Sequence, residues 1–320
     1  MKTDSSTPTI PPTRLALGLA FAAVYIIWGS TYLAIKVAVE TIPPFFMAAT
    51  RFLVAGVLLM TMLRLRGTPL PNRRQWMGGT VAGLLLLLGG NGMVAYAEQS
   101  IVSSVAALMI ATTPVWFAFF EWARPGGSPP KLRTVIGIAI SLVGVWMLVA
   151  PKHGGPMTVP WFGLCLLLFA CMSWAAGSLY GKHSVKPSSP WMGAATQMIG
   201  GGVGLVLAAG LNGELGRLHL HAVTSQSWLA LAYLIVFGSW VGFSAYIWLL
   251  KVSTPSLVST YAFVNPVVAV FLGWAMGGEP VASGMIVATV VIVAGVVVIT
   301  LPLEDWSARL IGKRVETPAS

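Results

Sequence analysis

The stretch WGSTYLAIKVAVETIPPFFMAATRFLVAGVLL, residues 28–59, decides the fold, because the chain contains a second version of it. It aligns without a gap with WAAGSLYGKHSVKPSSPWMGAATQMIGGGVGL, residues 174–205. Equivalent positions in the two stretches carry the same residue in several places, including Trp28 and Trp174, Lys36 and Lys182, and Pro44 and Pro190. Further on, Pro114-Val115 is matched by Pro266-Val267. The sequence is therefore built from two copies of one unit.

Each copy contains enough apolar sequence for five membrane spans, an odd number. A second copy with an odd number of spans enters the membrane from the opposite side, so the two copies are inverted relative to each other. Inverted repeats are typical of secondary transporters, which bind their substrate near the membrane midplane between the copies. The repeat thus indicates a class of function before any single residue does.

The composition indicates that the solvent of this protein is lipid. Of its 320 residues, 56% are hydrophobic and 9% are charged, whereas soluble domains have roughly 25% charged residues. The net charge of +10 does not indicate nucleic acid binding, because the basic residues lie between apolar stretches and form no continuous stripe. Cys165 and Cys171 do not share a face of the expected helix, so they indicate neither a disulfide nor a metal site.

We predict an all-α integral membrane protein with ten transmembrane helices, each about 20 residues long. The period-2 alternation of a membrane β-barrel is absent from the sequence. The expected spans are 15–35, 44–63, 76–97, 100–122, 132–150, 161–181, 190–211, 228–250, 254–275 and 281–301. The first repeat covers 15–150 and the second covers 161–301, with a disordered cytoplasmic tail at 1–14 and a second cytoplasmic tail at 302–320.

Lys and Arg residues predict the orientation, because they accumulate on the cytoplasmic side of membrane proteins. With the N-terminus inside, nearly all of them fall in cytoplasmic segments, and the exceptions outside the spans are Lys36, Lys152 and Arg217. We therefore expect a multi-pass protein with both termini in the cytoplasm. Lys36 and Lys182, which are equivalent in the repeat, then lie on opposite sides of the membrane, as inversion requires.

Arg51 is the charged residue that lies clearly inside an expected span. A guanidinium in hydrocarbon is costly, so it must face protein or a water-filled cavity. It can bind a carboxylate of the solute, or it can cap the carbonyls of a neighbouring helix, and the structural role is slightly favoured. Its repeat equivalent is Gln197, so the two copies differ chemically at this position.

Trp28 and Trp174 are expected deep in their spans, whereas Trp usually lies at the membrane interfaces. Either these two equivalent residues line a shared cavity, or they pack against small neighbours, and the sequence favours neither alternative. Tyr32 and Ser178, one turn further along, are also equivalent to each other. We include all four residues in the expected cavity lining.

Pro114 and Pro266 are expected to break two equivalent helices, because each removes one backbone hydrogen bond. Thr113 and Asn265 immediately precede them. Free carbonyls beside a polar side chain at mid-depth build substrate sites in carriers. Since both copies have this arrangement, we favour a site over a kink whose carbonyls Ser or Thr satisfies. The two prolines and Arg51 are assigned to the structural framework and its hinges.

Further polar and aromatic residues complete the expected cavity lining: Asn91, Trp240, Ser244 and Tyr261. Glycine pairs at 79/83, 200/204 and 273/277 have the spacing of close helix contacts. The alternative role for these pairs is the interface of a homodimer.

An enzyme is not expected. The four histidines lie in loops without the spacing of metal ligands, and no nucleotide-binding motif occurs, so we predict neither a metal nor a cofactor. No Asp or Glu lies at mid-membrane, so a carboxylate relay for protons has no obvious member. Glu98, at the outer end of the third expected span, is the nearest candidate, although a simple interfacial position is the favoured interpretation.

A family resemblance rests on the order of short motifs. Trp28-Gly29-Ser30-Thr31-Tyr32, then Lys36, Pro44 and Arg51-Phe52, resembles the start of an EamA-type repeat. The later part of an EamA-type repeat resembles four further motifs of this sequence, namely Pro114-Val115, Pro266-Val267, Gly278-Glu279 and Gly295-Val296. The chain thus resembles the EamA-like branch of the drug/metabolite transporter superfamily across 15–301. This resemblance implies a ten-helix inverted-repeat carrier for small metabolites, often an exporter in a bacterial plasma membrane.

Together these features predict a secondary transporter that moves amino acids or related amphipathic solutes by alternating access, with export as the expected direction. The alternative is a non-transporting membrane assembly or receptor subunit, which the short loops disfavour. The expected partners are a small-molecule solute and the lipid bilayer, and not nucleic acid.

Overall fold

The computed structural model describes residues 13–124, 129–149, 160–253, 258, 261–279 and 283–300, and all regular structure in these ranges is helical. The elements in chain order are α1 (Arg14–Ala22), η1 (Ala23–Ile27), α2 (Trp28–Val39), α3 (Pro44–Leu65), α4 (Arg73–Gly83), η2 (Leu84–Gly92), α5 (Met93–Ala97), α6 (Ser103–Ile110), α7 (Thr113–Ala123), α8 (Leu132–Val149), α9 (Trp161–His183), α10 (Pro190–Leu211), α11 (Glu214–Arg217), η3 (Leu220–Ala222), α12 (Ser225–Tyr233), η4 (Leu234–Phe243), α13 (Ser244–Val252), α15 (Tyr261–Ala275) and α16 (Ser283–Thr300).

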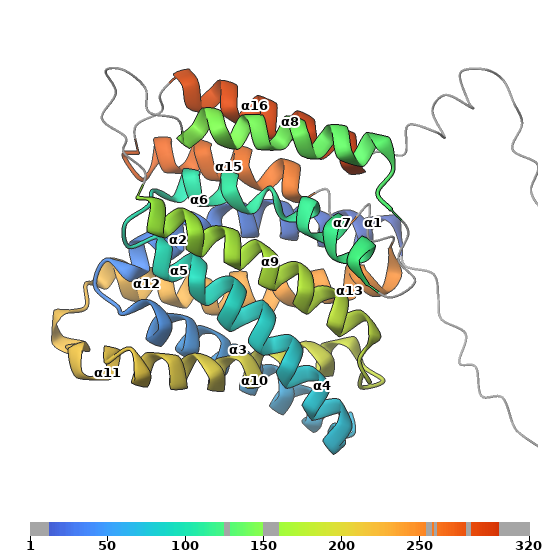
Figure 1. The fold of residues 1–320 in the computed structure, drawn as a ribbon. Helices are drawn as coiled ribbons and strands as arrows, with labels where there is room; N and C mark the ends of the chain where they lie inside the picture. The colour runs from blue at the N-terminus through green and yellow to red at the C-terminus, as the bar shows by residue number, and fades with distance from the viewer. Residues whose placement is uncertain are drawn as a thin grey trace, which may run out of the picture.

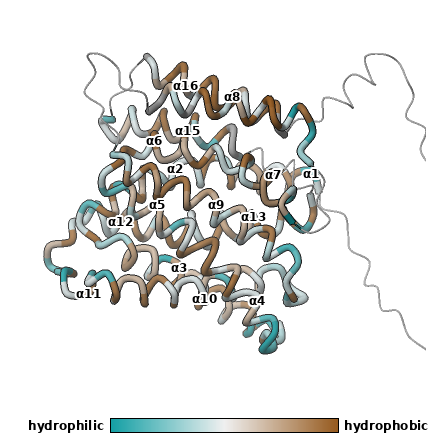
Figure 2. The backbone as a smooth tube through the Cα atoms, in the orientation of Figure 1, coloured by the Kyte–Doolittle hydropathy of each residue, from teal (hydrophilic) through white to brown (hydrophobic). Residues whose placement is uncertain are grey.

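The helices lie side by side in one bundle, with α8 and α16 along one edge and α3, α4 and α10 along the other (Figure 1). Between these edges lie α2, α9, η2 and η4, which surround the centre of the molecule. The described part begins with α1 and ends with α16 at the same end of the bundle, on the right in Figure 1. Apolar residues run along the helices, and hydrophilic residues gather at the connections (Figure 2).

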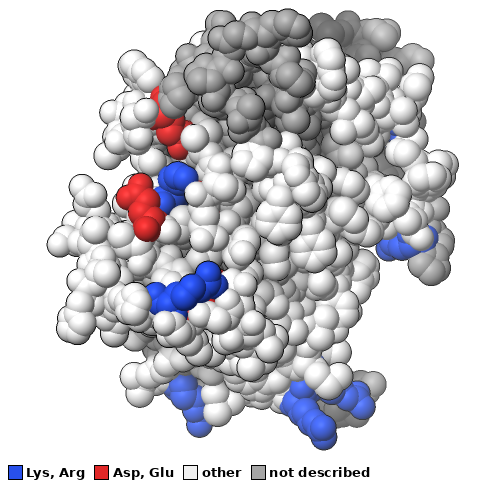
Figure 3. Space-filling view, turned by 60° about the vertical axis from the view of Figure 1, so that its left-hand side comes forward, with Lys and Arg blue, Asp and Glu red and all other residues white. Residues whose placement is uncertain are grey.

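The lengths of the helices fit a membrane. Seven helical runs in the described residues are long and apolar enough to cross a bilayer, and shorter apolar helices lie at Leu132–Gly144, Val264–Ala275 and Gly284–Gly295. The visible surface is almost entirely uncharged, with isolated groups of Lys, Arg, Asp and Glu (Figure 3). Large apolar side chains such as Trp146 and Leu207 are exposed on this surface. Lipid can solvate such a surface, whereas water cannot do so without a large cost.

The ends of several helices follow from local sequence. Pro44 and Pro190, equivalent in the repeat, each occupy the first turn of a helix, α3 and α10, where a missing N–H leaves no bond unmade. Asn72 and Gln75 form a reciprocal capping box at the start of α4. The first expected span, 15–35, continues as helix to Val39, so Lys36 lies on the last turn of α2.

The two predicted tails lie largely outside the described residues. Thr13 accepts a hydrogen bond from Ala16 N as the cap of α1, and Arg14 is the first residue of that helix. The last two residues of the predicted tail at 1–14 are therefore structured. The tail predicted at 302–320 falls wholly outside the described part of the chain.

Three helical runs contain π-helical turns, η1, η2 and η4. In a π-helix the hydrogen bonds reach one residue further than in an α-helix, and such turns are frequent at functional sites. The last two lie at equivalent positions of the two copies, since Asn91 in η2 corresponds to Phe243 in η4. The repeat therefore extends from the sequence to local backbone geometry.

Glycines allow α4 and α10 to approach closely. A Cβ added at Gly201 would lie 2.5 Å from the Gly83 carbonyl oxygen, and one added at Gly200 would lie 2.6 Å from Thr80 Cα. A Cβ added at Gly79 would lie 2.5 Å from Thr196 Oγ1. The glycine pairs 79/83 and 200/204 thus serve contacts between helices of one chain, as the favoured interpretation of their spacing predicts.

Changing Gly201 to Ala is expected to destabilise the bundle by about 1–3 kcal/mol, because overpacking of a close contact costs that much. The new methyl group meets backbone atoms of Gly83, which cannot move aside as a flexible side chain can. Thermal unfolding in detergent measures the effect. Gly193→Ala in the same helix is the matched control, since its added Cβ would meet only Pro187 Cδ at 3.9 Å. Equal melting temperatures for the two variants would contradict the prediction.

Candidate substrate pocket

A pocket lies at the centre of the bundle, and its empty volume of about 660 Å³ includes space open to solvent. Its walls come from both copies of the repeat. The lining residues are Trp28, Thr31, Tyr32, Ile35, Arg51, Phe52, Gly90, Asn91, Val94, Ile110, Thr113, Ala170, Trp174, Gly238, Phe243, Tyr261 and Asn265. Three repeat-equivalent pairs take part, namely Trp28 with Trp174, Asn91 with Phe243, and Thr113 with Asn265.

Most of the residues predicted from the sequence meet at this pocket. Those that line it are Trp28, Tyr32, Asn91, Thr113, Trp174, Tyr261 and Asn265. Ser178, Trp240 and Ser244 are not among its lining residues. Trp240 packs half-buried against the hydrophobic core, while the hydroxyl groups of Ser178 and Ser244 are buried without a hydrogen-bond partner in the described structure.

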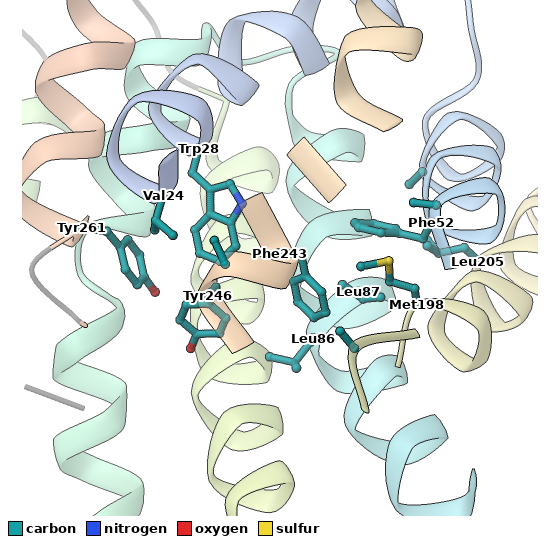
Figure 4. Close-up of a cluster of buried hydrophobic side chains, with 14 of the residues drawn as sticks. Val24, Trp28, Phe52, Leu86, Leu87, Met198, Leu205, Phe243, Tyr246 and Tyr261 are labelled. Carbon is teal, nitrogen blue, oxygen red and sulfur yellow. The ribbon is translucent and has the colours of Figure 1, made fainter. Parts of the chain in front are cut away.

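Aromatic rings form one wall of the pocket. The centroid of the Trp28 ring lies 5.8 Å from that of Trp174, 5.4 Å from that of Tyr261 and 4.9 Å from that of Tyr246. Figure 4 shows the Trp28, Tyr246 and Tyr261 side chains pointing toward one another. The two tryptophans of the repeat thus meet at the centre, where they both pack and line the cavity. Tyr246 belongs to this ring cluster but is not among the lining residues of the pocket.

The two tryptophans differ in their hydrogen bonds. The indole N–H of Trp28 donates to the carbonyl oxygen of Gly238 at 3.2 Å, which fixes this ring against η4. The indole Nε1 of Trp174 is buried and makes no hydrogen bond of good geometry in the described structure, although the hydroxyl groups of Tyr246 and Tyr261 lie near it. A buried donor that is poorly satisfied is unfavourable, so a bound solute with an acceptor can bind it.

Arg51 combines a structural contact with a place in the pocket wall. Its side chain is buried, Nε donates to Ser239 Oγ at 2.6 Å, and the guanidinium lies over the Phe52 ring, 4.7 Å from its centroid. Its two terminal nitrogens make no hydrogen bond to another described residue, and none of the described carboxylates forms an ion pair with it. The structural contact goes to a serine hydroxyl rather than to the helix carbonyls expected from the sequence, and binding of an anionic group by the terminal nitrogens stays a prediction.

The two prolines differ in their effect on the backbone. Helices α6 and α7 are separated by Ala111 and Thr112, so the fourth helical run breaks just before Pro114, as predicted. The hydroxyl of Thr113 donates to the Ile110 carbonyl at 2.6 Å, so this carbonyl is not free for a solute. The kink satisfied by a Thr hydroxyl, the alternative interpretation, therefore describes the first copy.

The predicted break at Pro266 is wrong, because α15 continues through this residue. Membrane helices tolerate proline where neighbouring groups satisfy the backbone. With its amide nitrogen turned toward the backbone, Asn265 donates to the carbonyl oxygens of Tyr261, at 3.2 Å, and Tyr25, at 3.1 Å. Asn265 therefore also braces α15 against η1.

Several lining residues were not predicted, chiefly apolar ones such as Ile35, Phe52 and Val94. Helical spacing could have found three lining residues, because Thr31 and Ile35 share a face with Trp28 and Val94 follows Asn91 by one turn. Gly238 also lines the pocket. A side chain at this position would meet the Arg51 guanidinium, since an added Cβ would lie 2.8 Å from Nη2.

Comparison with known proteins identifies the family. The EamA-like transporter family matches this chain twice, over residues 15–150 and over residues 161–301. The chain belongs to this family. The resemblance noted in the sequence motifs is thereby confirmed, and the protein is an integral membrane protein of a transporter family.

Relatives of this EamA-like protein occur in distant organisms. The inner membrane transporter YedA of Escherichia coli K12 is 43% identical over 284 residues, which cover 88% of this chain and 90% of that protein. The transporter YvbV of Bacillus subtilis is 26% identical and covers 95% of this chain and 97% of its own. A solved crystal structure shares the fold with a TM-score of 0.63 at 19% identity, over 95% of this chain and 100% of the other.

Proposed function

We propose that this EamA-like protein is a secondary transporter of small organic metabolites, namely amino acids or related amphipathic solutes. It works by alternating access around the central pocket and exports its solute. It has ten spans in two inverted five-helix repeats, lies in a bacterial inner membrane with both termini in the cytoplasm, and catalyses no reaction. The single observation that carries the proposal is the pocket itself, to which both copies contribute repeat-equivalent residues.

The chemistry of the pocket supports this class of solute. Aromatic rings supply apolar contact area, Arg51 supplies an unpaired cation, and Asn91 and Trp174 supply hydrogen-bonding groups. Asp, Glu and Lys are absent from the lining residues, so a solute with net positive charge would find no counter-ion there. A carboxylate joined to an apolar or aromatic group fits these walls best.

Thermal unfolding of the detergent-purified protein against amino acids, sugars, nucleosides and amphipathic cations tests the proposal. A ligand that binds only the folded state stabilises it by RT ln(1 + [L]/Kd), about 2.7 kcal/mol at 100 times Kd. We expect a dose-dependent rise in melting temperature with amino acids or related carboxylates.

The stabilising solute is then tested for exchange in proteoliposomes, with Asn91→Leu as the pocket variant and Gln99→Leu as an exposed control in the turn after the same span. Loss of stabilisation and exchange in the first variant alone supports the pocket. No stabilisation and no exchange at millimolar concentrations would overturn the proposal and favour an assembly or receptor subunit.

A further inference from the structure

Glu98 occupies an unexpected environment. It is the first residue after α5, retains helical backbone angles, and its N–H donates to the Val94 carbonyl at 2.9 Å. Val94 lines the pocket, so Glu98 lies one turn beyond the pocket wall on the same helical face. Its side chain is 0% exposed. This burial within the protein was not expected from the sequence, and the interfacial depth favoured there stays a prediction.

The carboxyl group of Glu98 has no partner. Neither of its oxygens accepts a hydrogen bond in the described structure. Lys36, the nearest cation on α2, donates from Nζ to the backbone carbonyl oxygen of Glu98 at 2.8 Å instead. An ionised carboxylate buried without a hydrogen bond is costly, whereas the protonated form is tolerated.

The other charged and titratable groups near Glu98 in the described structure form no hydrogen bond to its carboxyl group. Arg51 of α3 donates to Ser239, as described above, and Tyr32 of α2 is a neutral phenol that lines the pocket. Glu279, in the α15–α16 connection, accepts hydrogen bonds from the backbone and hydroxyl groups of Ser103 and Ser104. Four donors thus stabilise the charge of Glu279, and none stabilises that of Glu98.

Burial has the largest effect on the Glu98 carboxyl and raises its pKa well above the ordinary value. The negative charge of Glu279 raises this pKa further, while the positive charges of Lys36 and Arg51 act in the opposite direction. The geometry and the electrostatics therefore both favour a protonated Glu98 in the conformation seen here.

The contact between Lys36 and Glu98 lies one helical turn beyond the pocket wall. Tyr32 and Val94 line the pocket, and Lys36 and Glu98 each follow one of them by one helical turn. At the opposite end the repeat equivalents are Lys182 and Leu250, and both are exposed. Leu250 carries no carboxyl group, so the carboxyl group of Glu98 beside Lys36 has no chemical counterpart in the second copy.

We propose that Glu98 is a proton-binding site whose occupancy controls the opening of this end of the pocket. The carboxyl group holds a proton while Lys36 binds the Glu98 carbonyl and the end is closed. When the end opens, water reaches the carboxyl group, the O–H bond breaks and the proton passes to water, and the Lys36 ammonium can then pair with the carboxylate. This proposal rests on the transport function proposed above, because the gate it describes is the gate of that pocket.

The first test measures thermal unfolding of the full chain in detergent from pH 5 to pH 9 and needs no solute. An exposed glutamate loses its proton above about pH 4.3, so a native state that keeps the proton loses stability as pH rises, by about tenfold in the folding equilibrium per pH unit up to its own pKa. Glu98→Gln remains neutral at every pH. We expect the melting temperature of the wild type to fall with pH relative to that of Glu98→Gln.

Glu40→Gln is the matched control, because Glu40 is an exposed carboxyl group at the same end of the bundle. It should keep the pH dependence of the wild type. If Glu98→Gln does not fold, Glu98→Met removes the same proton site with an apolar side chain of similar length. Parallel pH profiles for the wild type and the neutral variant would overturn the proposal.

The second test measures solute exchange in proteoliposomes as a function of pH. The wild type should exchange solute at a rate that depends on pH, whereas Glu98→Gln should exchange it at a rate that does not. If the wild type exchanges no solute, the transport function fails while the unfolding experiment still decides whether Glu98 binds a proton. Equal pH dependence of exchange in both proteins would overturn the gate.

Discussion

Replacement of Arg51 by Gln is expected to weaken binding of carboxylate-bearing solutes by about 10- to 150-fold, because hydrogen bonds to charged groups contribute roughly 1.5–3 kcal/mol. The terminal nitrogens of Arg51 face the pocket without a partner, so the solute carboxylate is the group that can pair with them. Binding of analogues that lack the carboxylate should change little. Thermal shift titrations with a matched acid and amide measure the difference.

The same variant separates the two roles of Arg51. If its main role is structural, loss of the bond to Ser239 lowers the melting temperature of the solute-free protein. If its main role is binding, the melting temperature of the solute-free protein changes little. The second copy accommodates a glutamine, Gln197, at the equivalent position, so this side chain is compatible with the repeat. Arg64→Gln, an exposed change near the end of the same helix, is the control. Equal losses for the acid and the amide would refute the carboxylate clamp.

The sequence predicted the centre of the pocket because the repeat constrains it. Trp28 and Trp174 are equivalent in the sequence repeat and were both expected deep in their spans, and their ring centroids lie 5.8 Å apart. The same reasoning placed Thr113 and Asn265 in the wall. Repeat register thus predicts which faces converge, even though each motif is only a few residues long.

Local backbone geometry explains where the prediction fell short. Trp240 and Ser244 were included in the lining as polar and aromatic residues of the eighth expected span, but the run from Leu234 to Phe243, directly before Ser244, is π-helical. Wider turns change the angle between successive side chains, so a face inferred from 3.6 residues per turn drifts away from the pocket. The burial of Glu98 was not foreseen for a different reason, since groups distant in sequence lie near it, namely Lys36 of α2 and Glu279 of the α15–α16 connection.

Replacement of Trp174 by Ala is expected to reduce transport by roughly 30-fold, because truncating a central aromatic contact costs about 2 kcal/mol or more of binding energy. Trp174 contributes a ring to the pocket wall and a buried indole N–H that makes no hydrogen bond of good geometry to a described group. Exchange of the stabilising solute in proteoliposomes, at matched amounts of inserted protein, measures the loss. Trp161→Ala, an exposed change in the same helix, should transport normally.

Trp174→Phe divides this loss into its two parts. Phe keeps a ring beside Trp28 but lacks the N–H, and a neutral hydrogen bond contributes about 0.5–1.5 kcal/mol, so this variant should lose roughly 2- to 12-fold. An intermediate rate in Trp174→Phe, between the wild type and Trp174→Ala, indicates that both the ring and the donor contact the solute. Wild-type transport by Trp174→Ala would remove this residue from the site, because an aromatic wall cannot be lost from a binding pocket without effect.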